Sequence, residues 1–167
     1  MKYFVLKNLV VAATLSLLLP ACFRTIEETK NTKAPELYVV NVLSKELYDD
    51  AHIKGSIHVD LDSLETAAQT WDKKTPVILY CSNYMCTASS HAARELKKMG
   101  FEKVYAFEGG TAEWFQLSKN DPSYIIEGPA AESYLSHEVA APEHEEHDVD
   151  IISAQDLKNK MRSAGLL

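Results

Sequence analysis

A short apolar run that ends in a cysteine constrains this chain of 167 residues more than any other feature. Residues 77–80 are uniformly apolar, and Cys81 follows them directly. From Ser90, apolar residues recur at helical spacing until Gly100, so the pattern predicts a buried strand, a loop and a helix. The loop then lies over the amino terminus of that helix, where unpaired N–H groups and the positive end of the dipole favour an anion. A thiol in this place is expected to ionise below the ~8.5 of a free cysteine.

Strands and helices alternate along the chain on either side of this unit. Runs of β-branched and apolar residues predict strands, and apolar residues at helical spacing predict helices. The strands are expected at residues 37–42, 57–59 and 104–107, and the helices at residues 45–50, 64–71 and 112–117. This alternation indicates an α/β fold with a mainly parallel sheet and helices on both faces. In such sheets ligands bind outside the carboxyl ends of the strands, which is where Cys81 is expected.

Length and charge narrow the class of protein further. The length suits one compact domain with tails, and the net charge of −7 with a pI near 5.3 gives no electrostatic support to nucleic-acid binding. Three cysteines at dissimilar positions, Cys22, Cys81 and Cys86, do not make a disulfide-stapled miniprotein. Each cysteine therefore needs its own explanation.

The amino-terminal segment has the pattern of an export signal. Two lysines lie near the start, residues 9–19 form an apolar run too short to span a bilayer, and Leu-Pro-Ala-Cys22 follows. This ending resembles a bacterial lipobox, in which the cysteine is acylated. We expect a signal peptide at residues 1–21, lipidation at Cys22 and a polar tether over residues 22–35, which would place an exported protein in the cell envelope, facing the periplasm. The alternative is an ordinary signal peptide with an incidental Cys22.

Several motifs recur in one order along residues 36–120, the expected globular domain. They are Val39-Val40-Asn41-Val42, Ala51-His52-Ile53-Lys54-Gly55-Ser56-Ile57, the strand ending at Cys81, Gly100-Phe101, and Gly109-Gly110 with Trp114. In this order they resemble a rhodanese domain. The family's active-site cysteine falls on Cys81. The resemblance implies a sulfurtransferase in which that thiolate takes sulfane sulfur from thiosulfate or a similar donor, holds it as a persulfide, and passes it to a thiol or cyanide-type acceptor.

The resemblance also implies how the sulfur is held. No cofactor or metal is required, because backbone N–H groups of the loop can bind the terminal sulfur. The loop residues expected to do so are Ser82, Asn83, Tyr84, Met85, Thr87, Ala88 and Ser89. Common rhodanese loops carry an Arg or Lys and a Gly, and residues 82–89 contain neither. A rhodanese-fold phosphatase would need an arginine at the position of Thr87.

The second loop cysteine, Cys86, leaves three interpretations open. It is a resolving thiol that closes a disulfide with Cys81, a cysteine that relays or protects the persulfide, or a residue that packs the loop. The corresponding alternatives to sulfur transfer are a thiol–disulfide redox protein that uses both cysteines and a non-catalytic binding module with the rhodanese fold. The expected partners are a small sulfur-containing donor, a thiol acceptor that could be a protein thiol, and the membrane through the lipid anchor.

The carboxyl-terminal part is expected to form a flexible acidic extension. Residues 121–150 are rich in carboxylates and histidines and predict a solvated linker, and residues 151–167 predict a helix that starts at Ser153. Rhodanese domains commonly begin with a segment similar to this helix. We therefore expect residues 151–161 to fold back, in the manner of a circular permutation, and to bury Ile152, Leu157 and Met161 against the edge of the sheet.

Overall fold

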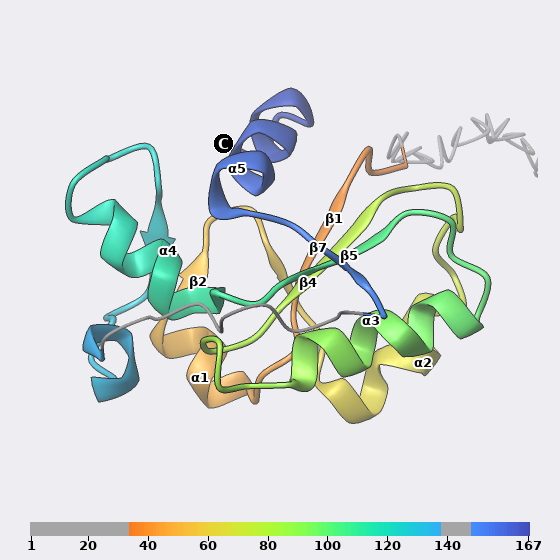
Figure 1. The fold of residues 1–167 in the computed structure, drawn as a ribbon, viewed down its shortest axis with the longest axis horizontal. Helices are drawn as coiled ribbons and strands as arrows, with labels where there is room; N and C mark the ends of the chain where they lie inside the picture. The colour runs from red at the N-terminus through yellow and green to blue at the C-terminus, as the bar shows by residue number, and fades with distance from the viewer. Residues whose placement is uncertain (1–33, 138–147) are drawn as a thin grey trace, which may run out of the picture. The chain divides into compact units, whose positions relative to one another are not determined.

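The computed structural model describes residues 34–137 and 148–167, and its centre is a five-stranded sheet (Figure 1). Every neighbouring pair of strands in this sheet is parallel. In spatial order the strands are β3 (Ile57–His58), β1 (Tyr38–Asn41), β4 (Val77–Tyr80), β5 (Val104–Phe107) and β7 (Asp150–Ile151). A separate antiparallel pair is formed by β2 (His52–Ile53) and β6 (Ile126–Glu127).

Helices cover both faces of the parallel sheet, which confirms the predicted α/β fold. In addition to α1 (Lys45–Asp50) and the short 3-10 segments η1 (Leu61–Ser63) and η2 (Ser133–Ser136), the helices are α2 (Leu64–Ala68), α3 (Ala88–Lys98), α4 (Gly110–Ser118) and α5 (Ala154–Ser163). Because side chains alternate along a strand, Leu79 packs on the α2 and α3 side, and Ile78 packs on the α4 and α5 side (Figure 1). The predicted strands at residues 77–80 and 104–107 have the observed bounds, whereas the helix expected over residues 64–71 ends at Ala68.

The amino-terminal predictions fall outside the described residues. These are the signal peptide, the lipidated Cys22 and all but the last two residues of the tether predicted over residues 22–35. Within residues 34–137 and 148–167, no helix is both long and apolar enough to cross a membrane.

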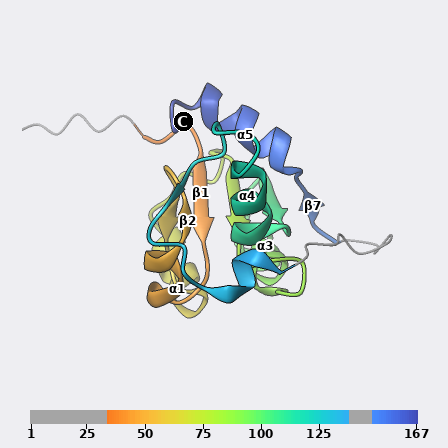
Figure 2. The same ribbon diagram turned by 90° about the vertical axis from the view of Figure 1, so that its left-hand side faces the viewer.

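The end of the chain completes the sheet and one of its two cores. Strand β7 pairs with β5 in parallel and leads directly into α5, as Figure 2 shows. Ile152, Leu157 and Met161 are buried, so the predicted return of this segment onto the domain is confirmed. The predicted place is wrong, because these side chains pack with residues of the interior strands β1 and β4 and not against the edge of the sheet. The predicted helix start is also confirmed, because Ser153 Oγ accepts the Asp156 N–H at 3.1 Å. The strand β7 itself was not predicted.

A buried lysine of α5 forms hydrogen bonds with the loop after α4. Lys158 is only 4% exposed, and its Nζ lies 2.9 Å from Asp121 Oδ2 and 3.1 Å from Ser123 Oγ. The ammonium also lies 3.8 Å from the centre of the Tyr124 ring. Hydrogen bonds from Ser123 and then from Lys158 hold the pKa of Asp121 well below its usual range, and the bond to Asp121 raises the pKa of Lys158.

We expect Lys158→Met to lower the melting temperature near neutral pH. The substitution keeps the apolar stem but removes the ammonium group whose hydrogen bond Asp121 accepts. Asp121 has a depressed folded pKa, so its share of the stabilisation is present above the unfolded value of ~3.9 and is lost as the pH falls through the folded pKa. Lys158 has a raised folded pKa. Its contribution to stability is therefore present below the unfolded pKa of ~10.4 and is lost as the pH rises through the folded pKa. Thermal melts at pH 7 and pH 2 check this, with the exposed Lys160→Met as the matched control. If the difference in melting temperature between wild type and Lys158→Met is the same at both pH values, the ion pair does not contribute to stability.

Part of the expected acidic linker is folded onto the domain. Strand β6 pairs with β2, and the side chain of Leu135 in η2 is fully buried. The Asp50 carboxylate accepts the N–H groups of Ala131 and Glu132 at 3.0 and 3.1 Å. The described residues 121–137 therefore differ from a solvated linker, because apolar and capping contacts hold them against the domain. Residues 138–147 of the expected linker lie outside the described part.

Candidate active site

Cys81 lies where the sequence predicted it, directly after β4 at the carboxyl end of the sheet. Its side chain is fully buried. The start of α4 holds its backbone, because the Thr111 N–H donates to the Cys81 carbonyl at 2.9 Å and the Ala112 N–H donates to the Ser82 carbonyl at 2.9 Å. Gly110 makes this approach possible: its φ is +59°, and a Cβ there would meet the Cys81 carbonyl oxygen at 2.4 Å.

The loop between β4 and α3 folds back on itself. Asn83 Oδ1 accepts the Met85 N–H at 3.0 Å, and the Asn83 carbonyl accepts the Cys86 N–H at 3.0 Å. The Met85 amide, which the sequence placed among the candidates for binding an anion, and the Cys86 amide therefore already have partners within the loop. The turn brings Cys86 back to Cys81, whose Sγ is 3.1 Å from the Cys86 carbonyl oxygen and 3.5 Å from Ser89 Oγ.

The two cysteines are in contact, and their pKa values shift in opposite directions. The pKa of Cys86 is lowered to about 5, first by hydrogen bonding with the Cys81 side chain and then by the backbone N–H groups of Ala88 and Ser82. The pKa of Cys81 is raised, first by its hydrogen bond to Cys86 and then by burial and by the charge on Cys86. The prediction that Cys81 ionises more readily than a free thiol is therefore wrong for the reduced pair. When the reduced pair loses its first proton, that proton comes from Cys86.

This order of ionisation predicts the pH dependence of alkylation. Cys86 of the wild type is expected to react with iodoacetamide with a midpoint at about pH 5. In Cys81→Ala the thiol that donates to Cys86 is gone, so the midpoint should move up toward the ~8.5 of a free cysteine. Peptide mass spectrometry after brief alkylation between pH 4 and 9 measures both curves. Equal midpoints in the two proteins would show that Cys81 does not stabilise the Cys86 thiolate.

Two carboxylates lie beside the loop and the start of α3. The Tyr84 hydroxyl donates to Glu113 Oε2 at 3.1 Å, and Ser90 Oγ donates to Glu108 Oε1 at 2.7 Å. Burial raises the pKa of Glu113, and burial together with the Glu113 charge raises the pKa of Tyr84 to about 12. Met85 at the tip is 90% exposed. The loop thus offers an anion backbone amides and hydroxyl groups, with negative charge at its rim.

Comparison with known proteins decides the family. The model of the rhodanese-like domain matches residues 24–117, which is more than half of the chain. The chain belongs to the rhodanese-like family.

Curated relatives of this rhodanese-like protein include two bacterial enzymes of the same name. The thiosulfate sulfurtransferase GlpE of Coxiella burnetii is 28% identical over 89 residues, which cover 53% of this chain and 81% of that protein. The thiosulfate sulfurtransferase GlpE of Tolumonas auensis is 31% identical over 80 residues, which cover 48% and 74%. Among solved structures, the BH2092 protein of Bacillus halodurans is 26% identical with a TM-score of 0.49, and the match covers 57% of this chain and 66% of that one.

The candidate residues of the rhodanese-like site come together in part. Cys81, Cys86 and the buried Ser89 meet at the start of α3, whereas Met85 points into solvent. Sequence reasoning missed Glu113 and Thr111, which α4 brings to the loop from far along the chain. The glycine pair before Thr111 was the available signal, because one of its members allows the close approach of α4.

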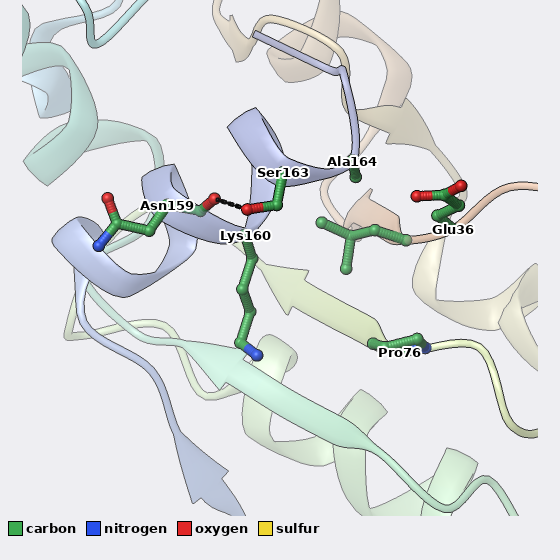
Figure 3. Close-up of a pocket in the computed structure, with 7 residues that line it drawn as sticks. Glu36, Pro76, Asn159, Lys160, Ser163 and Ala164 are labelled. Carbon is green, nitrogen blue, oxygen red and sulfur yellow. Dashed lines mark hydrogen bonds between the residues drawn. The ribbon is translucent and has the colours of Figure 1, made fainter.

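A separate pocket of about 370 Å³ lies at the other end of the sheet (Figure 3). It is lined by Glu36 and Leu37 before β1, Pro76 before β4, and Asn159, Lys160, Ser163 and Ala164 of α5. These residues adjoin the amino ends of β1 and β4, and Cys81 follows the carboxyl end of β4. The pocket therefore does not belong to the thiol site of the rhodanese-like domain.

Proposed function

We propose that this protein is a sulfurtransferase in which Cys81 carries sulfane sulfur, as a persulfide, from a donor to a thiol or cyanide-type acceptor. The observation that carries the proposal is the place of Cys81: a thiol at the carboxyl end of a parallel strand, beside the start of α3, with Ser89 Oγ 3.5 Å from its sulfur. The names of the two curated relatives support the same class of reaction.

The reaction consists of two displacements at sulfur. With thiosulfate as donor, the Cys81 thiolate attacks the sulfane sulfur, the S–S bond breaks, and sulfite leaves with the electron pair. A nucleophilic acceptor then takes the terminal sulfur of the persulfide, and Cys81 returns as a thiolate. Neither displacement needs a metal or a cofactor. We assign the Cys86 thiolate as the acceptor of the Cys81 proton, because the two cysteines are in contact and the pKa of Cys86 is the lowered one.

The charge around the loop favours some donors over others. Residues 82–89 contain no Lys or Arg, and Glu108 and Glu113 lie beside them. A dianion such as thiosulfate meets carboxylates beside a loop that has no Lys or Arg of its own, whereas the persulfide of a small thiol carries less charge at its reacting end. We therefore propose that persulfides of small thiols load Cys81 more readily than thiosulfate does.

Labelled sulfane sulfur tests this function directly. The reduced Cys86→Ser protein, which keeps Cys81 as its loop thiol, is incubated with labelled thiosulfate or labelled glutathione persulfide, freed of small molecules, and then treated with cyanide. We expect up to one equivalent of protein-bound label, which cyanide releases as thiocyanate, with faster loading from the persulfide. No bound label from either donor would contradict sulfur transfer and favour the binding module or the dithiol redox protein.

We also propose that the protein is exported and anchored through Cys22. The pattern of residues 1–22 supports this proposal. Cys22→Ala is expected to move the protein from the membrane fraction to the soluble exported fraction or to block its processing. Fractionation of the cell envelope measures the distribution, and a wild type that is already soluble would contradict the anchor.

A further inference from the structure

A second thiol occupies the place where the sequence predicted a bound anion. Cys86 is half-buried and lies against the fully buried Cys81, whose Sγ is 3.1 Å from the Cys86 carbonyl oxygen. The backbone N–H groups of Ser82 and Ala88 contribute to the lowered pKa of Cys86. A persulfide formed on Cys81 would therefore lie next to a second thiol.

The loop also brings the two cysteines within the range of a disulfide. Cys81 Sγ is 3.1 Å from the carbonyl oxygen of Cys86, and that oxygen is about 2.4 Å from the Cα of its own residue by standard geometry. The sulfur of Cys81 therefore lies no more than about 5.5 Å from the Cα of Cys86. A disulfide usually joins cysteines whose Cα atoms lie about 4.4–6.8 Å apart, so the bond can close with a small movement of the loop.

We propose that Cys86 resolves the persulfide by attacking Sγ of Cys81, which closes a Cys81–Cys86 disulfide and expels the terminal sulfur as hydrosulfide. This inference rests on the proposed function, since it begins from the Cys81 persulfide. It adds hydrosulfide as a product of the site and a thiol reductant as the partner that must then reduce the disulfide.

The atoms and electrons of this step balance. The Cys86 thiol passes its proton to the terminal sulfur of the persulfide, and its thiolate forms a bond to Cys81 Sγ as the old S–S bond breaks. The sulfane sulfur takes the electron pair and leaves as HS⁻, so it is reduced while the two cysteines are oxidised together. With thiosulfate as donor, one turnover converts thiosulfate and the dithiol, which carries one proton, to sulfite, hydrosulfide and the disulfide.

Attack at the inner sulfur follows from the contact in the reduced site. Sγ of Cys81 itself lies against Cys86, 3.1 Å from the Cys86 carbonyl oxygen. The terminal sulfur of a persulfide lies one S–S bond farther out, about 2 Å beyond Sγ. A relay of sulfur from Cys81 to Cys86 would need the loop to retreat by that length, whereas resolution uses the existing contact.

The disulfide defines the reaction that must come next. The protein can turn over again only after a thiol or dithiol reductant has reduced the disulfide by exchange. Cys86 is the partly exposed member of the pair, so the reductant attacks its sulfur and Cys81 leaves as the thiol. The site would thus couple the reduction of sulfane sulfur to a thiol–disulfide exchange protein or a small thiol.

Three proteins and two readouts test the proposal: the wild type, Cys86→Ser and Cys81→Ser, each incubated anaerobically with excess thiosulfate and without added thiol. The wild type should lose two hydrogens in mass and release one equivalent of hydrosulfide per protein. Cys86→Ser should gain one sulfur and release none, because it loads Cys81 but lacks the resolving thiol. Cys81→Ser should do neither, and a wild-type sample without thiosulfate controls for adventitious oxidation.

The outcomes separate this inference from the proposed function. If the wild type keeps the added sulfur on Cys81 and releases no hydrosulfide, resolution by Cys86 is overturned while sulfur transfer stands. If the added sulfur is found on Cys86, a relay replaces resolution. If the wild type forms no disulfide and releases no hydrosulfide, and Cys86→Ser takes up no sulfur from thiosulfate or from glutathione persulfide, the proposed function fails, and the resolving step fails with it.

Discussion

Replacing Cys81 by serine is expected to lower the rate of sulfur transfer to cyanide by roughly 10³-fold or more, because a hydroxyl cannot form the persulfide that links the two displacements. The fold should survive, since serine is slightly smaller than cysteine and its hydroxyl can donate to the Cys86 carbonyl that the thiol contacts at 3.1 Å. Thiocyanate formation measures the rate, and a thermal melt checks the fold.

Cys86→Ser is the matched control for this substitution. It changes the neighbouring thiol in the same way but leaves Cys81 able to load, and it removes the largest cause that raises the Cys81 pKa. Transfer near the wild-type rate in Cys81→Ser, together with its loss in Cys86→Ser, would move the persulfide to Cys86.

Truncation after Val149 is the second change with a large expected effect. It removes β7 and α5, and with them the buried side chains of Ile152, Leu157 and Met161. Burial of such a side chain is worth ~1.5–3 kcal/mol before the cost of ordering is subtracted. The truncation also exposes Leu37 and Ile78, which pack in the same core. We therefore expect the melting temperature to fall by roughly 10 °C or more, or the chain to fail to fold.

A pair of point substitutions in α5 distinguishes lost packing from other effects of truncation. Leu157→Asp and Asn159→Asp each add one negative charge to the same helix, but Leu157 is fully buried and Asn159 is exposed. Leu157→Asp should destabilise nearly as much as the truncation, because it places a charge in the core. Asn159→Asp should melt close to the wild type. Equal melts for the truncated, Leu157→Asp and wild-type proteins would show that α5 does not support the domain.

The sequence was most informative where local pattern and tertiary structure agree. The central strands at residues 77–80 and 104–107 are continuous apolar runs, and Ser153 with Asp156 makes a local cap that needs no distant partner. The two-residue strands β2, β6 and β7 could not be predicted, because pairs so short depend on the strand beside them. In η2, acidic composition concealed Leu135, whose burial depends on contact with α4.

In the candidate site, too, the features set by local sequence could be predicted and those set by tertiary contacts could not. The position of Cys81 follows from a strand that ends and a helix that begins, both of which are local. The order in which the two thiols ionise depends on where the turn at Asn83 places the Cys86 sulfur, and on which amides reach it. Glu113 joins the site only because α4 packs against the loop, so composition gave no sign of the negative rim.

The site of the added sulfur is the most direct test of transfer through Cys81. Cys86→Ser, loaded with excess thiosulfate or glutathione persulfide and then alkylated without reductant, can be cleaved by trypsin and the fragment of residues 75–94 sequenced by mass spectrometry. In this fragment Cys81 is the remaining cysteine. We expect one added sulfur on Cys81, removable by cyanide. A Cys81 alkylated directly on its own thiol, with no added sulfur after exposure to either donor, would contradict sulfur transfer by this protein.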